Sequence, residues 1–101
     1  INADTLEMMK PTAFLINTSR GALVDEPALI QALKEHKIAG AGLDVQETEP
    51  PVEDNPLYTL DNVILTPHMG WKGLETRQRL LHILKGNIDG FINGKPVNVV
   101  S

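Results

Sequence analysis

The chain has no cysteine among its 101 residues. This absence excludes disulfides, thiolate catalysis and cysteine-based zinc sites, and it permits the cytoplasmic setting that we predict. Histidine, another common metal-binding side chain, occurs three times, at positions too scattered to give ligand spacing. We therefore predict no metal site.

Long apolar runs and an excess of basic residues are also missing. No apolar stretch approaches the roughly 20 residues needed to span a bilayer. With Lys+Arg 9 and Asp+Glu 13, the net charge is -4, so no basic patch is available to meet nucleic acid or an anionic membrane. We expect neither as a partner. The hydrophobic share of 42% is enough for a packed core, and the length fits one domain or part of one.

The hydrophobic pattern predicts an α/β fold. In chain order, we expect a helix over 2–10, a buried strand within 13–19, a helix within 20–37, a buried strand within 38–45, a long loop over 46–62, a buried strand over 63–66 and an amphipathic helix over 72–94. Strands that are apolar throughout, rather than alternating, are typical of a parallel sheet covered on both faces. A loop as long as 46–62 inside a compact domain is often functional.

Local signals refine the ends and faces of the helices. The first helix has Asn2 or Asp4 as its cap and should end at Pro11. The second has Asp25 as N-cap, and Glu26 and Pro27 suit its first turn. One face of the second helix carries Leu29, Ala32, Leu33 and His36.

The last predicted helix carries an apolar stripe made of Leu81, Leu84, Ile88 and Phe91. Gly86 and Gly90 should weaken it, and Gly94 can end it. His36 and His82 both fall within predicted helices and have no polar cluster nearby, so we interpret them as structural.

Each predicted strand ends in a polar cluster, at residues 17–21, 44–50 and 66–70. Ligands of an open parallel sheet bind at the carboxyl ends of its strands, so the three clusters should meet on one rim. Each member also has a structural interpretation. Arg20 could be a surface or capping residue, Gly21 a turn glycine and Asp44 a buried turn former. The pattern alone leaves both interpretations open.

The chemistry of such a rim can be stated. Arginine matches a carboxylate with a planar pair of donors, and histidine exchanges a proton near neutral pH. A neighbouring carboxylate favours the imidazolium form and orients the ring. This set would hold an anionic substrate and transfer a proton to its oxygen. A serine hydrolase is disfavoured, because Ser19 is not in a Gly-x-Ser-x-Gly elbow.

The motifs MKPTAFLINTSRGALVDEPALIQAL, AGAGLDVQETEPP, NPL and NVILTPHMGW resemble, in order and spacing, one known family. They are similar to the C-terminal part of the nucleotide-binding domain of D-isomer-specific 2-hydroxyacid dehydrogenases. Trp71, soon after the histidine, is typical of the glycerate dehydrogenase (hydroxypyruvate reductase) branch. The resemblance implies a partial Rossmann-like parallel sheet of about three strands with flanking helices, a fragment of a two-domain dehydrogenase. Residues 1–92 would belong to the NAD(P)-binding domain, and residues 93–101 would be a tail returning toward the substrate domain.

The resemblance also implies roles for single residues. The catalytic residues would be Arg20, Glu49 (rather than Glu47) and His68. The cofactor site would include Thr18, Ser19, Arg20, Asp44, His68 and Gly70, with Asp44 at the carboxamide. The implied cofactor is NAD, with NADP not excluded, and the substrate is a small 2-keto or 2-hydroxy acid. The full-length parent would be a homodimer. Phosphite dehydrogenase retains the same catalytic trio, so the trio does not exclude it.

Two further absences limit what the chain can do by itself. It starts at Ile1 rather than methionine, which we interpret as the start of a fragment. The Gly-x-Gly-x-x-Gly fingerprint of the family does not occur, and the residue that selects NAD or NADP lies upstream in the family. We therefore predict that the isolated chain is inactive. A non-catalytic, NAD-sensing corepressor-like or scaffold relative is the alternative, although Trp71 and the ending KPVNVVS favour the enzyme.

Overall fold

The computed structural model describes residues 1–100, which fall into two compact units, one of Ile1–Met69 and one that starts at Gly70. The first unit holds all the strands and all the predicted catalytic residues. Among the described residues, no helix is both long and apolar enough to cross a membrane. The predicted division into residues 1–92 and 93–101 remains a prediction.

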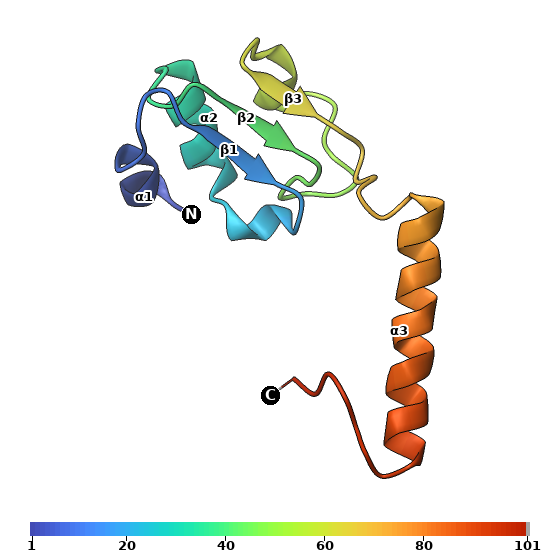
Figure 1. The fold of residues 1–101 in the computed structure, drawn as a ribbon. Helices are drawn as coiled ribbons and strands as arrows, with labels where there is room; N and C mark the ends of the chain where they lie inside the picture. Colours follow the sequence, from blue (N-terminus) through green and yellow to red (C-terminus); the bar gives the residue numbers. More distant parts are fainter. Residues whose placement is uncertain (101) are drawn as a thin grey trace. The chain divides into compact units, whose positions relative to one another are not determined.

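A three-stranded parallel sheet forms the centre of the first unit (Figure 1). Its strands are β1 (Phe14–Asn17), β2 (Gly40–Leu43) and β3 (Val63–Leu65), in the order β1-β2-β3. The last residues of the three strands pair in register, Asn17 with Leu43 and Leu43 with Leu65. The predicted parallel α/β fold is therefore confirmed, and the three carboxyl ends lie on one edge.

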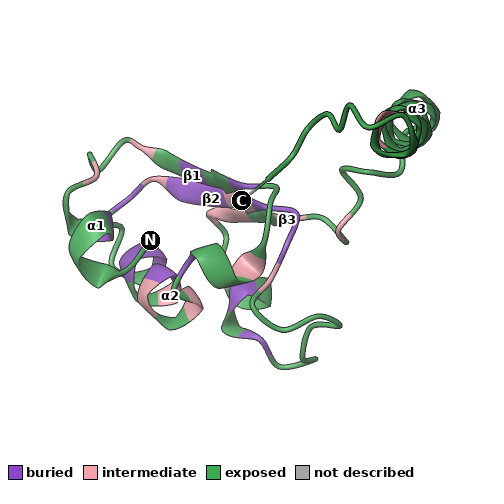
Figure 2. Ribbon diagram, turned by 90° about the horizontal axis from the view of Figure 1, so that it is seen from below, coloured by how far each residue is buried: buried purple, intermediate pink, exposed green. Residues whose placement is uncertain are grey.

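One face of this sheet is covered by helices, as Figure 2 shows for α1 (Ala3–Glu7) and α2 (Glu26–Lys34). The predicted apolar face of α2 supplies Leu29, Ala32 and Leu33 to the core. The largest fully buried side chains are Leu6, Leu29, Leu33, Ile38 and Leu57. The core thus lies between the sheet and this single helical layer.

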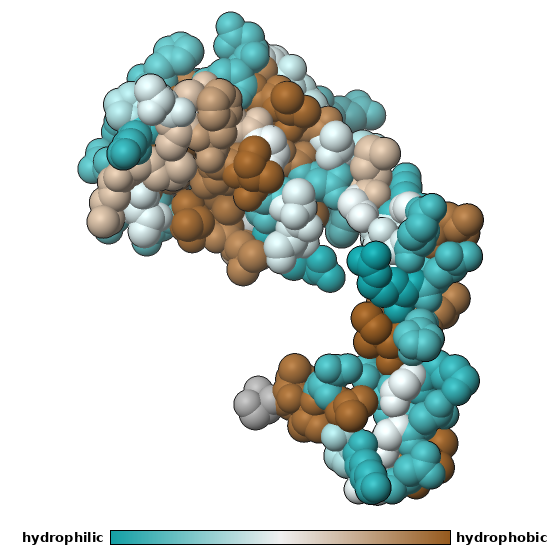
Figure 3. Space-filling model, viewed as in Figure 1, coloured by the Kyte–Doolittle hydropathy of each residue, from teal (hydrophilic) through white to brown (hydrophobic). Residues whose placement is uncertain are grey.

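The other face of the sheet is exposed, which corrects the prediction of strands buried on both faces. Burial alternates along β1, where Leu15 and Asn17 are buried while Phe14 and Ile16 are exposed. Ile64 of β3 is exposed as well. Figure 3 shows hydrophobic side chains gathered over the strands. The apolar pattern predicted a sheet with helices packed on both faces. Within residues 1–69, helices pack on only one face.

Hydrogen bonds define where the helices α1 and α2 begin and end. Asn2 caps α1 in a capping box with Thr5, and the helix ends at Glu7, before Pro11 is reached. Asp25 caps α2 as predicted, through the amide of Ala28.

The second helix ends earlier than predicted, at Lys34. The amides of His36 and Lys37 close a Schellman motif on Leu33 and Ala32. His36 takes the left-handed position of this motif, with φ 51°. It is therefore exposed beyond the helix and does not extend the apolar face.

The long loop after β2 contains a short 3-10 helix, η2 (Pro56–Thr59). A second 3-10 helix, η1 (Gly21–Leu23), is the next element after β1. Leu57 of η2 is buried in the core, and this contact anchors the far end of the loop beside β3.

The second unit consists of α3 (Leu74–Ile92) and the chain after it. Gly86 and Gly90 do not interrupt the helix. The helix ends at Ile92, and Gly94, the predicted stop, has φ 68° and closes a second Schellman motif with Lys95. The chain then runs back along the helix, and Asn98 Nδ2 donates a hydrogen bond to Asn87 Oδ1 of α3 at 2.8 Å. The predicted apolar stripe is present but exposed: Leu81, Leu84, Ile88 and Phe91.

Candidate active site

The polar ends of the three strands meet at one edge of the sheet, as predicted. The amide of Asp44 donates to Asn17 O at 2.9 Å, and the amide of Thr66 donates to Leu43 O at 3.0 Å. These bonds continue the sheet pairing by one residue and bring the chains that follow the strands side by side. Arg20, Glu49 and His68 all lie on the segments that follow this edge.

The first of these segments, after β1, is shaped by Asn17. Its buried side chain accepts from the amide of Ser19 at 3.1 Å and donates to Arg20 O at 2.9 Å. These bonds form an Asx turn that fixes the backbone of Arg20. The Arg20 guanidinium is exposed, with Nη1 donating to Ser19 O at 2.7 Å. A cationic side chain is thus presented to solvent from a fixed turn.

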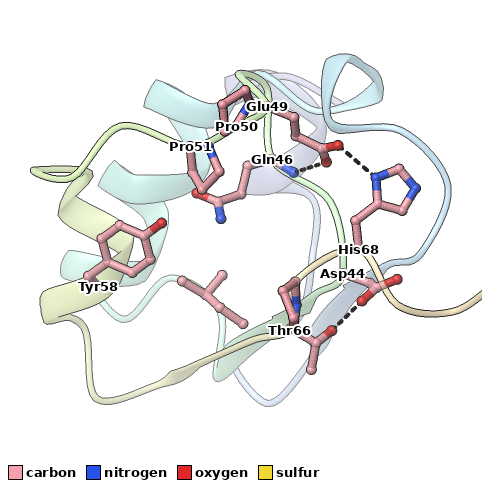
Figure 4. A pocket seen from close by; sticks show the side chains of 10 residues that line it. Asp44, Gln46, Glu49, Pro50, Pro51, Tyr58, Thr66 and His68 are labelled. Atoms are coloured by element: carbon pink, nitrogen blue, oxygen red, sulfur yellow. Dashed lines mark hydrogen bonds and ion pairs between the residues drawn. The ribbon is translucent and has the colours of Figure 1, made fainter. Parts of the chain in front are cut away.

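The centre of the site is a pair formed by His68 and Glu49. His68 Nδ1 lies 2.6 Å from Glu49 Oε2, and both side chains are partly exposed (Figure 4). Figure 4 shows the other ring nitrogen of His68 directed away from Tyr58 and Pro51. The bond at Nδ1 orients the ring and sets its tautomer.

The backbone around His68 is constrained on both sides. Pro67 precedes it, and the amide of His68 donates to Thr66 O at 3.0 Å across that proline. His68 itself has φ 48°, a left-handed conformation that is uncommon outside glycine. A histidine held in such a conformation in a polar cluster is a candidate for a functional residue.

The side chain of Asp44 stabilises the turn at His68 through hydrogen bonds. The buried Asp44 Oδ1 accepts from Thr66 Oγ1 at 2.5 Å and from the amide of Met69 at 2.9 Å. The carboxylate therefore bonds to both sides of His68. The resemblance placed Asp44 at the cofactor, and the structure adds a role in fixing the histidine turn. The alternative prediction, that Asp44 is a buried turn former, agrees with this geometry.

Neighbouring groups keep Glu49 ionised. Its hydrogen bond with His68 is the main cause that lowers the pKa of Glu49. The bond from the Gln46 amide, at 3.1 Å, and the charges of His68 and Arg20 lower this pKa further. Glu49 is therefore the carboxylate that pairs with His68, and its catalytic role in place of Glu47 stays a prediction.

Two cavities adjoin Glu49. One, of about 590 Å³, is lined by residues that include Glu49, His68, Tyr58, Leu65 and Pro51. The second, of about 280 Å³, is shared by Glu49, Arg20 and Glu47. Glu49 thus lies between the arginine and the histidine, and the predicted trio is gathered in one place.

The remaining predicted residues have different settings. Thr18 and Ser19 are exposed on the segment after β1. Gly70 is the first residue of the second unit. Within residues 1–100, no group of three or more metal-ligating side chains is found. Sequence reasoning missed the contribution of Glu26 and Asn55, which bond to the loop that carries Glu49. The Asn-Pro-Leu motif was the feature of the sequence that could have pointed to Asn55.

A parallel α/β sheet with a polar rim of this kind defines a Rossmann-type nucleotide-binding unit. Residues 1–70 match the family described as D-isomer specific 2-hydroxyacid dehydrogenase, NAD binding domain. The chain belongs to this family.

Individual relatives agree with this assignment. The chain is 51% identical to a glycerate dehydrogenase of Methylorubrum extorquens, over 99% of this chain and 32% of that protein. It is 45% identical to a hydroxypyruvate reductase of Blautia hydrogenotrophica, over 100% of this chain and 31% of that protein. A solved acyclic imino acid reductase, in complex with NADPH and D-Arg, superposes with a TM-score of 0.85 at 44% identity, over 98% of this chain and 31% of that one. The chain thus spans about a third of the length of the relatives it matches.

Proposed function

We propose that this chain is the C-terminal half of the nucleotide-binding domain of an NAD(P)-dependent D-2-hydroxyacid dehydrogenase of the glycerate/hydroxypyruvate type. The observation that carries the proposal is the 2.6 Å pair of His68 and Glu49, which lies next to Arg20 on the ligand-binding edge of the sheet. The similarity to a glycerate dehydrogenase and a hydroxypyruvate reductase supports the substrate class. A cytoplasmic homodimer is part of the proposal for the full-length protein.

The residues of the rim fit the nicotinamide end of a dinucleotide. Thr18 and Ser19 are exposed on the segment after β1, and Arg20 and His68 add a cation and a ring donor on the segments that follow β1 and β3. These side chains would hold the nicotinamide end, together with Asp44. The chain has no Gly-x-Gly-x-x-Gly sequence, so the pyrophosphate would be held by residues outside it.

The proposed mechanism gives each residue of the trio one task. The nicotinamide, when bound, supplies the hydride to the substrate carbonyl carbon. Arg20 binds the substrate carboxylate through paired donors and polarises the carbonyl. His68 donates its Nε2 proton to the oxygen as negative charge develops there. Glu49 orients the ring and stabilises its protonated form.

The test is a turnover assay of the full-length protein with NADH and NADPH against hydroxypyruvate, glyoxylate and larger 2-keto acids. We expect the highest kcat/KM with hydroxypyruvate or glyoxylate. The isolated 101-residue chain should be inactive and should bind NAD weakly or not at all by calorimetry. Dinucleotide binding by the full-length protein without turnover on any acid would instead support an NAD-sensing relative.

Replacing Glu49 with glutamine should change the pH dependence of reduction. Glutamine keeps an acceptor for His68 Nδ1 but removes the charge that stabilises the imidazolium. The alkaline limb of the kcat profile for reduction should therefore move to lower pH. The measurement is kcat across pH for the wild type, for Glu49→Gln and for Glu47→Gln as the matched control. An alkaline limb that stays in place in Glu49→Gln would contradict the pairing.

A further inference from the structure

The loop that carries Glu49 is attached to helix α2 by one side chain, Glu26. Glu26 is the first residue of α2. Its Oε2 accepts from the amide of Glu47 at 2.9 Å, and its Oε1 accepts from Asn55 Nδ2 at 2.8 Å. One carboxylate therefore binds the loop at two points that lie on either side of Glu49 in the sequence.

Asn55 completes the attachment from the far end of the loop. Its side chain is buried, and its Nδ2 also lies 3.1 Å from Gln46 Oε1. Its Oδ1 accepts from the amide of Leu57 at 2.9 Å and so caps η2, whose Leu57 is in the core. Asn55 thus connects both ends of the loop to Glu26 and to the packed interior.

Glu49 depends on the near end of this loop for its own placement. The amide of Gln46, which precedes the residue bound by Glu26, donates to Glu49 Oε1 at 3.1 Å. The other carboxylate oxygen then meets His68. A shift of residues 46 and 47 would therefore move Glu49 relative to the histidine.

We propose that Glu26 and Asn55 form a positioning pair that fixes the loop over 46–55 so that Glu49 meets His68. This inference rests on the proposed function, because the geometry it protects is that of the acid-base pair. Glu26 and Asn55 touch neither substrate nor cofactor in this scheme. They act only through the loop.

A simpler role for Glu26 would be to stabilise the start of α2, since an acidic side chain is favourable in a first helical turn. That role requires the charge of Glu26 and does not involve Asn55. A change at Asn55 that leaves Glu26 intact therefore separates the two explanations. Several charged or titratable groups surround Glu49, and a change in the pH dependence of activity has to be interpreted with all of them. They are Arg20, Asp44, Glu47, Tyr58 and His68.

The discriminating variant is Asn55→Asp. It keeps the Oδ1 acceptor that caps η2 but replaces the Nδ2 donor with an oxygen facing the Glu26 carboxylate. Glu26→Gln is the second single variant. Its amide has one acceptor oxygen, whereas the Glu47 amide and Asn55 Nδ2 need two. In the double variant E26Q/N55D a donor at position 26 faces an acceptor at position 55, and the net charge is unchanged. Glu53→Gln is the matched control, since Glu53 is exposed in the same loop.

In the full-length protein we expect each single variant to lower kcat about 10-fold to 100-fold, because small misplacements of catalytic groups have effects of this order. KM for the keto acid should change less, and the alkaline limb should move as in Glu49→Gln. The double variant should recover most of the loss, and Glu53→Gln should behave as wild type. Single variants with wild-type kcat, or a double variant no better than Asn55→Asp, would overturn the pair.

A second readout does not depend on turnover. Hydrogen exchange of the Glu47 amide should become faster in both single variants and return toward wild type in the double variant. The NMR signals of the His68 ring should also shift in the single variants and return toward their wild-type positions in the double variant. If the wild-type protein reduces no keto acid, the proposed function fails, and these two measurements still decide the positioning pair. Unchanged exchange at Glu47 in both single variants would refute it.

Discussion

Replacing His68 with glutamine in the full-length protein should reduce kcat by about 10²-fold to 10⁴-fold, the range for a lost acid-base group. Glutamine is similar in reach and can still donate a hydrogen bond, but it cannot transfer a proton near neutral pH. The hydrogen bonds of Asp44 on either side of His68 should keep the local turn in place. The loss should therefore lie in the chemical step.

Steady-state kinetics and NADH binding measured by fluorescence separate the two contributions. NADH affinity should change only a few-fold, because the proposed contacts of the dinucleotide are spread over several residues. His82→Gln is the matched control, since His82 is an exposed residue of α3. Wild-type turnover in His68→Gln would remove the histidine from the mechanism.

Replacing Gly21 with alanine should disturb the same site by a steric route. A Cβ atom at Gly21 would lie 1.9 Å from Gln46 O, 2.1 Å from Gln46 C and 2.5 Å from Glu47 N. These are backbone atoms of the loop that carries Glu49, so a side-chain rotation cannot relieve the contact. The loop must move away from η1, and overpacking of this kind costs about 1–3 kcal/mol or more.

Urea unfolding of the full-length protein measures this cost, and kcat reports the displaced loop. Gly86→Ala is an informative control, because a Cβ there meets nothing within 4 Å. In a helix interior that replacement should stabilise the protein by up to about 1 kcal/mol. Equal stabilities for Gly21→Ala and the wild type would show that η1 and the loop are not held in this close contact.

Some features of the fold were predictable because they depend on local chemistry. The cap at Asp25 and the stop at Gly94 follow from hydrogen bonds and backbone freedom within one turn. The rim of polar residues followed from a general property of parallel sheets, and His68 and Glu49 are in contact there. The catalytic roles of these residues remain predictions that the experiments above address.

Other features depend on contacts between distant segments. The apolar pattern of β1 does not say that only one of its faces is covered within residues 1–69. Gly21 was interpreted as a possible turn glycine, but the structure shows that the reason for glycine is the approach of the loop from residue 46. The bonds of Glu26 to Glu47 and Asn55 span 21 and 29 residues, and no local pattern encodes them.

By itself, the sequence determined the class of fold, the family and the three side chains gathered at the strand ends, because strand periodicity and short motifs record local structure. Only the tertiary structure decided how those side chains are held. Asp44 bonds to both sides of the His68 turn, and Glu26 with Asn55 fixes the loop of Glu49. Such bonds join residues far apart in the chain, and their distances exist only once the sheet has brought its edges together.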